Sequence, residues 1–166
     1  MEKLWSPWRS QYIESFKEKK SGSKGCIFCS AQNDDLNDDQ SLLVFRGEKT
    51  FTVLNLYPYN NGHLMVVPYR HVSDISELSA EELTEAMTTM QKLVDALRSI
   101  SSPEGFNIGA NLGKVAGAGI ADHIHFHIVP RWNGDTNFMP VIGSVKVLSQ
   151  DLLATKKQLQ QYFGVS

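Results

Sequence analysis

Short apolar runs separated by turn residues occupy the first half of the chain. Three of these runs are LLVFRG (42–47), FTVLNLYP (51–58) and GHLMVVPYR (62–70), and they are rich in β-branched and aromatic residues. Runs of this length, bounded by turns that contain glycine and asparagine, are typical of β-strands. The pattern therefore predicts an antiparallel strand meander over residues 42–70.

A period of three to four residues replaces this pattern in the middle of the chain. Between Ser79 and Ile100, apolar residues recur at that spacing, at Leu83, Met87, Met90, Val94 and Leu97. Ser79 is followed three residues later by Glu82, which is the pattern of a capping box at the start of a helix. We therefore predict one long amphipathic helix whose methionines lie in the core.

Two further strands and a second helix complete the expected fold. FNIGANLG (106–113) and HIHFHIVPRW (123–132) carry strand patterns on either side of a glycine-rich segment, and a helix is expected from about Gln150 to Phe163. Strands that precede and follow a helix, without strict alternation, favour the α+β class. We expect a mainly antiparallel sheet of about five strands, one long helix and a C-terminal helix.

Length, composition and charge indicate a single domain without a strongly charged surface. The 166 residues are 42% hydrophobic, and 16 basic residues against 18 acidic ones give a net charge of −2. This balance argues against a broad electrostatic surface for nucleic acid or for an anionic membrane. No apolar run reaches the ~18 residues of a membrane span, and the N-terminus has no signal-peptide core, so we expect a cytoplasmic protein.

Residues 17–41 are polar and predict an exposed connection around the motif CIFC. Cys26 and Cys29 are too few for a secreted disulfide scaffold, and their spacing indicates metal binding or redox chemistry. Redox chemistry is disfavoured because no β-α unit surrounds Cys26. A tetrahedral zinc site would need two further ligands, for which His71 and His123 are available.

Three of the five histidines, His123, His125 and His127, alternate with apolar residues. Since successive side chains of a strand point to opposite faces, the three imidazoles would share one face while the apolar residues pack on the core. Buried imidazoles need hydrogen-bond partners, so three on one face indicate function rather than structure. Such a face suits zinc ligation or nucleophilic catalysis, and the three histidines alone do not distinguish the two.

The segment HIHFHIV resembles the alternating histidine signature of the histidine triad (HIT) family, and FTVLNLYPYNNGHLMVVPYRHV is similar to the first-half pattern of that family. Together the resembling segments span residues 45–132. The resemblance implies a HIT-like fold and a nucleotide substrate, with His125 as the nucleophile that forms a nucleotidyl-histidine intermediate. It also implies that His127 and His63 line the phosphate site and that the chemical step needs no cofactor.

The same resemblance assigns the remaining candidate residues. It implies a substrate-binding set made of Asn55, which would contact the ribose, with Phe51, Leu54, Asn111, Gly119 and Trp132. It further implies a closed, structural zinc site formed by Cys26, Cys29, His71 and His123. A single domain would then cover residues 1–166, with a zinc-binding segment over about 1–41, catalytic strands and helices over about 42–132, and a tail and helix over 133–166.

The chain resembles one branch of the family more than the others. Family hydrolases and phosphoramidases usually carry Gln or Ser where this chain has Gly119, whereas the opening LWSPWRSQYI, Trp132 and the following NGDTNFMPVIG resemble the bacterial diadenosine tetraphosphate phosphorylases. That branch implies inorganic phosphate as co-substrate, ADP and ATP as products, and a homodimer. We expect donors to the phosphate among Arg131, Asn137 and the glycine-rich run 113–119.

Three alternatives stay open at this point. A dinucleoside polyphosphate hydrolase or nucleoside phosphoramidase of the same family shares the first half-reaction and differs in its acceptor or leaving group. A nucleotide-binding module without turnover agrees with Gly119 but not with three intact histidines. A zinc hydrolase that places all three histidines on one metal would compete with Cys26 and Cys29 for His123.

Overall fold

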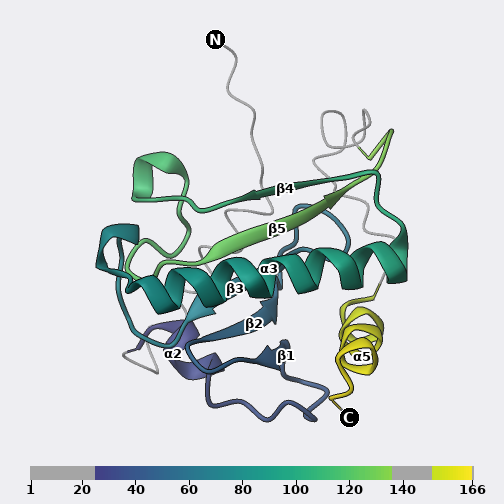
Figure 1. The fold of residues 1–166 in the computed structure, drawn as a ribbon, viewed down its shortest axis with the longest axis horizontal. Helices are drawn as coiled ribbons and strands as arrows, with labels where there is room; N and C mark the ends of the chain where they lie inside the picture. Colours follow the sequence, from purple (N-terminus) through teal and green to yellow (C-terminus); the bar gives the residue numbers. More distant parts are fainter. Residues whose placement is uncertain (1–24, 136–150, 166) are drawn as a thin grey trace.

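The computed structural model describes residues 25–135 and 151–165 (Figure 1). Its centre is a five-stranded antiparallel sheet, formed by β1 (Leu43–Arg46), β2 (Thr50–Leu54), β3 (Leu64–Pro68), β4 (Gly105–Gly109) and β5 (Phe126–Arg131). The strands lie in the order β1-β2-β3-β5-β4. The expected α+β fold with a five-stranded antiparallel sheet is therefore confirmed.

Helices pack on the sheet and beside its β1 edge. They are α2 (Ile27–Ala31), α3 (Ala80–Ser101) and α5 (Leu152–Phe163), with short 3-10 turns η1 (Ile75–Glu77) and η2 (Lys114–Ala116). Figure 1 shows α3 running across the sheet and α5 beside it, near β1. Within the described ranges, no helix is long and apolar enough to cross a membrane.

The long helix begins at the capping box that the sequence predicted. The Ser79 side chain accepts a hydrogen bond from the Glu82 backbone N–H, and the Glu82 carboxylate accepts one from the Ser79 N–H. Of its two methionines, Met90 is buried, whereas Met87 is 58% exposed, so the placement of Met87 in the core was wrong. Met87 lies outside the buried face that Ala86, Met90 and Leu93 present to the sheet.

Alternation along the strands separates two apolar clusters, one on each face of the sheet. The cluster on the α3 side includes Leu54, Leu64, Val66, Phe126 and Ile128 from the strands. The cluster on the opposite face consists of Phe28 from α2 together with Leu43, Phe51, Val53, Met65 and Val67. His127 is the register partner of Met65, so its side chain belongs to the face turned away from α3.

Several segments differ from the sequence-based expectation. The strand expected over 106–113 ends at Gly109, which leaves Asn111 in the loop that follows. The strand expected over 123–132 begins at Phe126, because the next hydrogen-bonded pair in this register would join Ile124 to Pro68, which has no N–H to donate. Ile124 instead donates its N–H to the Val72 carbonyl. The expected exposed connection around CIFC contains a short helix, α2, which buries Phe28 against the sheet.

Candidate active site

His125, His127 and His63 come together on the face of the sheet opposite α3. The ring centroids of His125 and His127 lie 4.8 Å apart, and those of His63 and His127 lie 5.0 Å apart. His63 immediately precedes β3 and is fully buried, and His125 immediately precedes β5 and is 6% exposed. His125 and His127 line a narrow pocket of about 40 Å³.

Hydrogen bonds to the backbone determine which ring nitrogens carry protons. The Tyr59 backbone N–H donates to Nδ1 of His63 at 3.0 Å, so Nε2 of His63 is the protonated nitrogen and donates to Nδ1 of His127 at 2.9 Å. Nε2 of His127 therefore carries a proton. Nδ1 of His125 donates to the His123 carbonyl at 2.9 Å, which leaves the lone pair on Nε2 of His125.

His125 and His127 are both neutral near pH 7. Burial lowers the pKa of His125, and burial together with the nearby His125 lowers the pKa of His127 to about 4. A neutral imidazole with an unprotonated Nε2 is a competent nucleophile. The Nε2–H of His127, one ring away, is a donor suited to a phosphate oxygen. The arrangement can therefore attack phosphorus and stabilise the charge on its oxygens.

Three of the six candidate substrate-binding residues line this pocket: Asn55, Asn111 and Gly119. The structure does not bring the other three to it. Phe51 and Leu54 are fully buried in the clusters on opposite faces of the sheet. Trp132 donates its indole N–H to the Ser101 carbonyl at the far end of β5.

Gly117, from the glycine-rich run expected to contact phosphate, lines the same pocket, and sequence reasoning missed four further lining residues: Tyr57, Tyr59, Met65 and Ile120. The Tyr59 ring stacks on the His63 ring at a centroid distance of 5.1 Å and an interplanar angle of 17°. Tyr59 lies between Asn55 and His63 in the chain, so its place in the connecting loop was a usable signal. Met65 shared a strand face with His63, which alternation also predicts.

Arg131, expected as a phosphate donor, is engaged elsewhere. Its guanidinium binds both carboxylate oxygens of Asp135, at 2.5 and 2.8 Å, and donates to the Asn107 side chain. This pairing, with a hydrogen bond from Asn60, lowers the pKa of Asp135 to about 2. Arg131 therefore fixes the turn after β5, while Asn137 lies outside the described residues.

Four side chains near the pocket form a cluster suited to a metal ion: Cys26, Cys29, His71 and His123. One ligand atom from each lies within 4.8 Å of the others. The Cys26 Sγ is 3.3 Å from Nδ1 of His123, and the Cys29 Sγ is 3.3 Å from Nδ1 of His71. Ligand atoms of tetrahedral zinc lie roughly 3.3–3.8 Å apart, a range that includes these two pairs, and the donor set of two cysteines and two histidines fits structural zinc.

The orientation of His123 agrees with a ligand role. Its Nε2–H donates to the Pro68 carbonyl at 2.9 Å, which leaves the Nδ1 lone pair facing the cysteines. The Phe28 ring, carried between the two cysteines, contacts both His123 and His125 at centroid distances of 5.5 and 4.8 Å. The metal cluster and the nucleophile are thus neighbours joined by α2.

Comparisons with known proteins agree with this geometry. Residues 37–134 match the HIT domain family. The chain is 42% identical over 161 residues to a protein of Mycobacterium tuberculosis named AP-4-A phosphorylase, in an alignment that covers 96% of this chain and 83% of that protein. It is 30% identical over 108 residues to a Schizosaccharomyces pombe protein named adenosine 5'-monophosphoramidase, with 65% and 75% of the two chains covered.

A solved structure shares the fold. A zinc-bound histidine triad family protein of Mycobacterium smegmatis has a TM-score of 0.67 and 26% identity, and the alignment covers 86% of this chain and 96% of that one. The resemblance drawn from the histidine pattern is confirmed over most of the chain. The chain therefore belongs to the HIT family of nucleotide-cleaving enzymes.

Proposed function

We propose that this chain cleaves diadenosine tetraphosphate by phosphorolysis, yielding ADP and ATP. The observation that carries the proposal is the lone pair on Nε2 of His125, fixed by the hydrogen bond from Nδ1 to the His123 carbonyl. Nε2 would attack the α-phosphorus, displace ATP and hold the adenylyl group. His127 would donate its Nε2–H to a phosphate oxygen, and His63 would orient that donor, since its own Nε2–H is bonded to Nδ1 of His127.

Substrate contacts follow from the lining of the pocket. We assign Asn55 and Asn111 to the ribose and phosphate, because both line the pocket that contains His125. The Asn55 side chain is also held by a hydrogen bond from the Tyr57 backbone N–H, which fixes the direction of its amide. Gly119 would offer a backbone N–H where other branches have a side chain.

Zinc would occupy the cluster of Cys26, Cys29, His71 and His123. Four protein ligands leave no open position, so the metal would supply structure rather than catalysis. Burial raises the pKa of the Cys26 thiol to about 11, so the thiol stays protonated near neutral pH unless a cation binds it. Bound there, the metal would tie α2 to the catalytic segment.

Phosphate as acceptor and a homodimer belong to the same proposal. The relative named AP-4-A phosphorylase, 42% identical over 161 residues, supports phosphate as acceptor. The dimer is supported by β4, which forms an edge of the sheet and exposes 51% of Ile108. A second β4 could extend the sheet across a two-fold axis.

The second candidate is a nucleoside phosphoramidase or a dinucleoside polyphosphate hydrolase. It is favoured by the similarity to the S. pombe protein named adenosine 5'-monophosphoramidase. All of these activities share the attack by His125 and differ in the leaving group or in the acceptor. The identity of the products therefore separates them.

Product analysis tests the proposal directly. Diadenosine tetraphosphate is incubated with the enzyme in the presence and absence of inorganic phosphate, and products are identified by mass. Phosphate-dependent formation of ADP and ATP is the expected result, whereas phosphate-independent AMP and ATP would assign the hydrolase activity. His125→Asn should abolish turnover while keeping nucleotide affinity within roughly tenfold, because binding comes from other contacts.

A further inference from the structure

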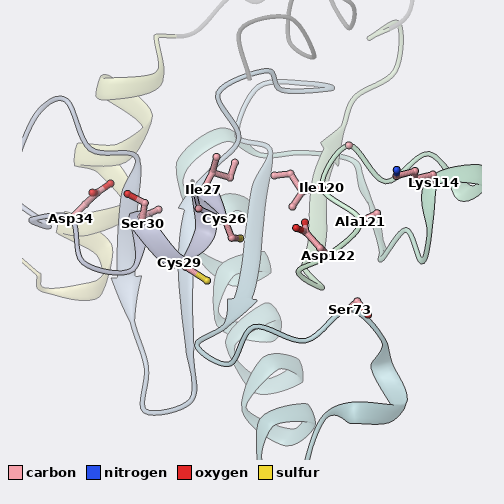
Figure 2. Close-up of a pocket in the computed structure, with 13 residues that line it drawn as sticks. Cys26, Ile27, Cys29, Ser30, Asp34, Ser73, Lys114, Ile120, Ala121 and Asp122 are labelled. Atoms are coloured by element: carbon pink, nitrogen blue, oxygen red, sulfur yellow. The ribbon is translucent and has the colours of Figure 1, made fainter. Parts of the chain in front are cut away.

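A second hollow, of about 920 Å³, opens beside the narrow pocket over His125. Residues 25–27 and 29–31 line one side of it and residues 119–122 line the other, as Figure 2 shows for Ile27 and Ile120. Gly119 and Ile120 also line the His125 pocket. A ligand whose phosphorus lies at His125 can therefore extend into this hollow.

Lys114 supplies the positive charge of this hollow. Among the described residues that line it, Lys114 is the one cation, and Asp34 and Asp122 are the two anions. Figure 2 places Asp34 at the opposite side of the hollow from Lys114. A phosphate group beyond the reacting phosphorus would therefore bind at Lys114, on the side of the hollow away from Asp34 and facing away from Asp122.

The turn that carries Lys114 also reaches the His125 pocket. Lys114 begins η2, which is flanked by Gly113 at φ 78° and Gly117 at φ 90°, and these left-handed conformations fold the segment back on itself. Gly117 lines the His125 pocket, while Lys114 lines the hollow. A single short turn thus connects the nucleophile with a cation.

Three arginines in this part of the chain are engaged elsewhere, and Arg46 among them donates to the backbone carbonyls of Gln32 and Asp34. Arg131 pairs with Asp135, and Arg70 pairs with Glu82 through two hydrogen bonds of 2.7 and 2.8 Å. None of the three arginines lines the hollow or the His125 pocket. Within the described chain, the charge available to a phosphate next to the reacting phosphorus is therefore that of Lys114.

We propose that Lys114 forms a subsite for the phosphate group that lies across the reacting phosphorus from His125. The proposal rests on the proposed nucleotidyl-transfer function. Two sources share this chemistry, namely the terminal phosphate of the departing nucleotide and inorganic phosphate as the acceptor. A lysine ammonium in a hollow stabilises either as a point charge.

The two half-reactions explain why one cation can serve both sources. In the first, Nε2 of His125 bonds to the α-phosphorus, and the electron pair of the bond to the bridging oxygen leaves with the departing nucleotide. In the second, an oxygen of inorganic phosphate bonds to the same phosphorus, and the phosphorus–nitrogen electron pair returns to Nε2. Each step places a phosphate group on the side of the phosphorus opposite His125.

Binding provides a test that does not depend on turnover. ADP carries a phosphate at the proposed subsite and AMP does not, so their dissociation constants are compared by calorimetry in the His125→Asn background. Adding Lys114→Gln should reduce the preference for ADP over AMP by about 10- to 100-fold, the range expected for one charged contact. Lys114→Arg should retain the preference, and Lys92→Gln, an exposed charge on α3, should leave it unchanged.

Kinetic measurements then show whether the departing nucleotide or inorganic phosphate supplies the phosphate group that binds at Lys114. With His125 intact, Lys114→Gln should raise the KM for inorganic phosphate if the acceptor binds there. It should slow adduct formation from diadenosine tetraphosphate, but not from adenosine 5'-phosphoramidate, if the departing phosphate binds there. An unchanged ADP preference, unchanged kinetics, or equal slowing with both substrates overturns the proposal. If the wild-type enzyme forms no adduct, the proposed function fails, and the calorimetric comparison still decides the role of Lys114.

Discussion

Replacing Phe28 with alanine removes the side chain that joins α2 to the catalytic face. The ring is 1% exposed, belongs to the apolar cluster with Phe51 and Met65, and contacts the rings of His123 and His125. Its removal leaves a cavity that a helix of five residues has little means to close. Phe→Ala substitutions at buried sites cost about 3–5 kcal/mol.

That cost is large against the stability of an ordinary domain, which is about 5–15 kcal/mol. For a chain of this length, each kcal/mol lowers the melting temperature by about 2–4 °C, so Phe28→Ala should lower it by about 6–20 °C. Thermal and urea denaturation measure the effect at one fixed zinc concentration, because a metal that binds only the folded state adds stability.

A matched variant separates this effect from a general loss of apolar surface. Met87→Ala shortens an apolar side chain that is 58% exposed and should change the free energy of unfolding by less than about 0.5 kcal/mol. Phe28→Leu, which keeps most of the volume, should fall between the two. A loss for Phe28→Ala no larger than that for Met87→Ala would show that α2 does not pack as described.

Three other perturbations have expected outcomes. Between pH 7 and pH 4 the free energy of unfolding should fall by about 3 kcal/mol on account of His127, because the unfolded ring protonates near pH 6.5 and the folded ring near pH 4; His127→Gln should remove that part of the titration. Glu82→Gln should lower the free energy of unfolding by about 1–2 kcal/mol in urea titrations above pH 5, since it weakens the helix cap and the pair with Arg70. In the wild type the pKa of Glu82 is lowered to about 2, so its contribution to stability is lost as the pH falls from about 4 towards 2. Metal analysis should find about one zinc per chain in wild type and less in Cys29→Ala, whose melting temperature should fall more than its rate of adduct formation.

Local rules predicted much of this fold because the residues involved act through neighbours in the chain. The capping box depends on Ser79 and Glu82, three positions apart, and both hydrogen bonds form. Asp151 likewise caps α5 close to the expected start at Gln150. Strand alternation also anticipated that His127 would face away from the α3 side, as its register with Met65 requires.

Other features depend on contacts between distant segments. The helix α2 is too short to form on its own, and its stability comes from burying Phe28 against the sheet, which no local pattern reports. Arg131 was expected to donate to phosphate because it is a cation close to the three histidines in the chain, yet its guanidinium is bound to Asp135 in the turn after β5. Leu54 and Phe51 were assigned to one pocket, although their odd spacing on β2 directs them to opposite faces of the sheet.

The spacing of the three histidines gains a physical explanation from their hydrogen bonds. His123 uses Nε2–H on the Pro68 carbonyl and directs Nδ1 to the cysteines, while its own carbonyl accepts from Nδ1 of His125. His125 is thereby left with an unprotonated Nε2, and His127 receives its proton position from His63. If the register of this segment shifted by one residue, each ring would turn to the α3 side, into the apolar cluster. The two-residue spacing therefore keeps all three rings on the same face, where one can bind metal, one can attack phosphorus and one can donate to phosphate.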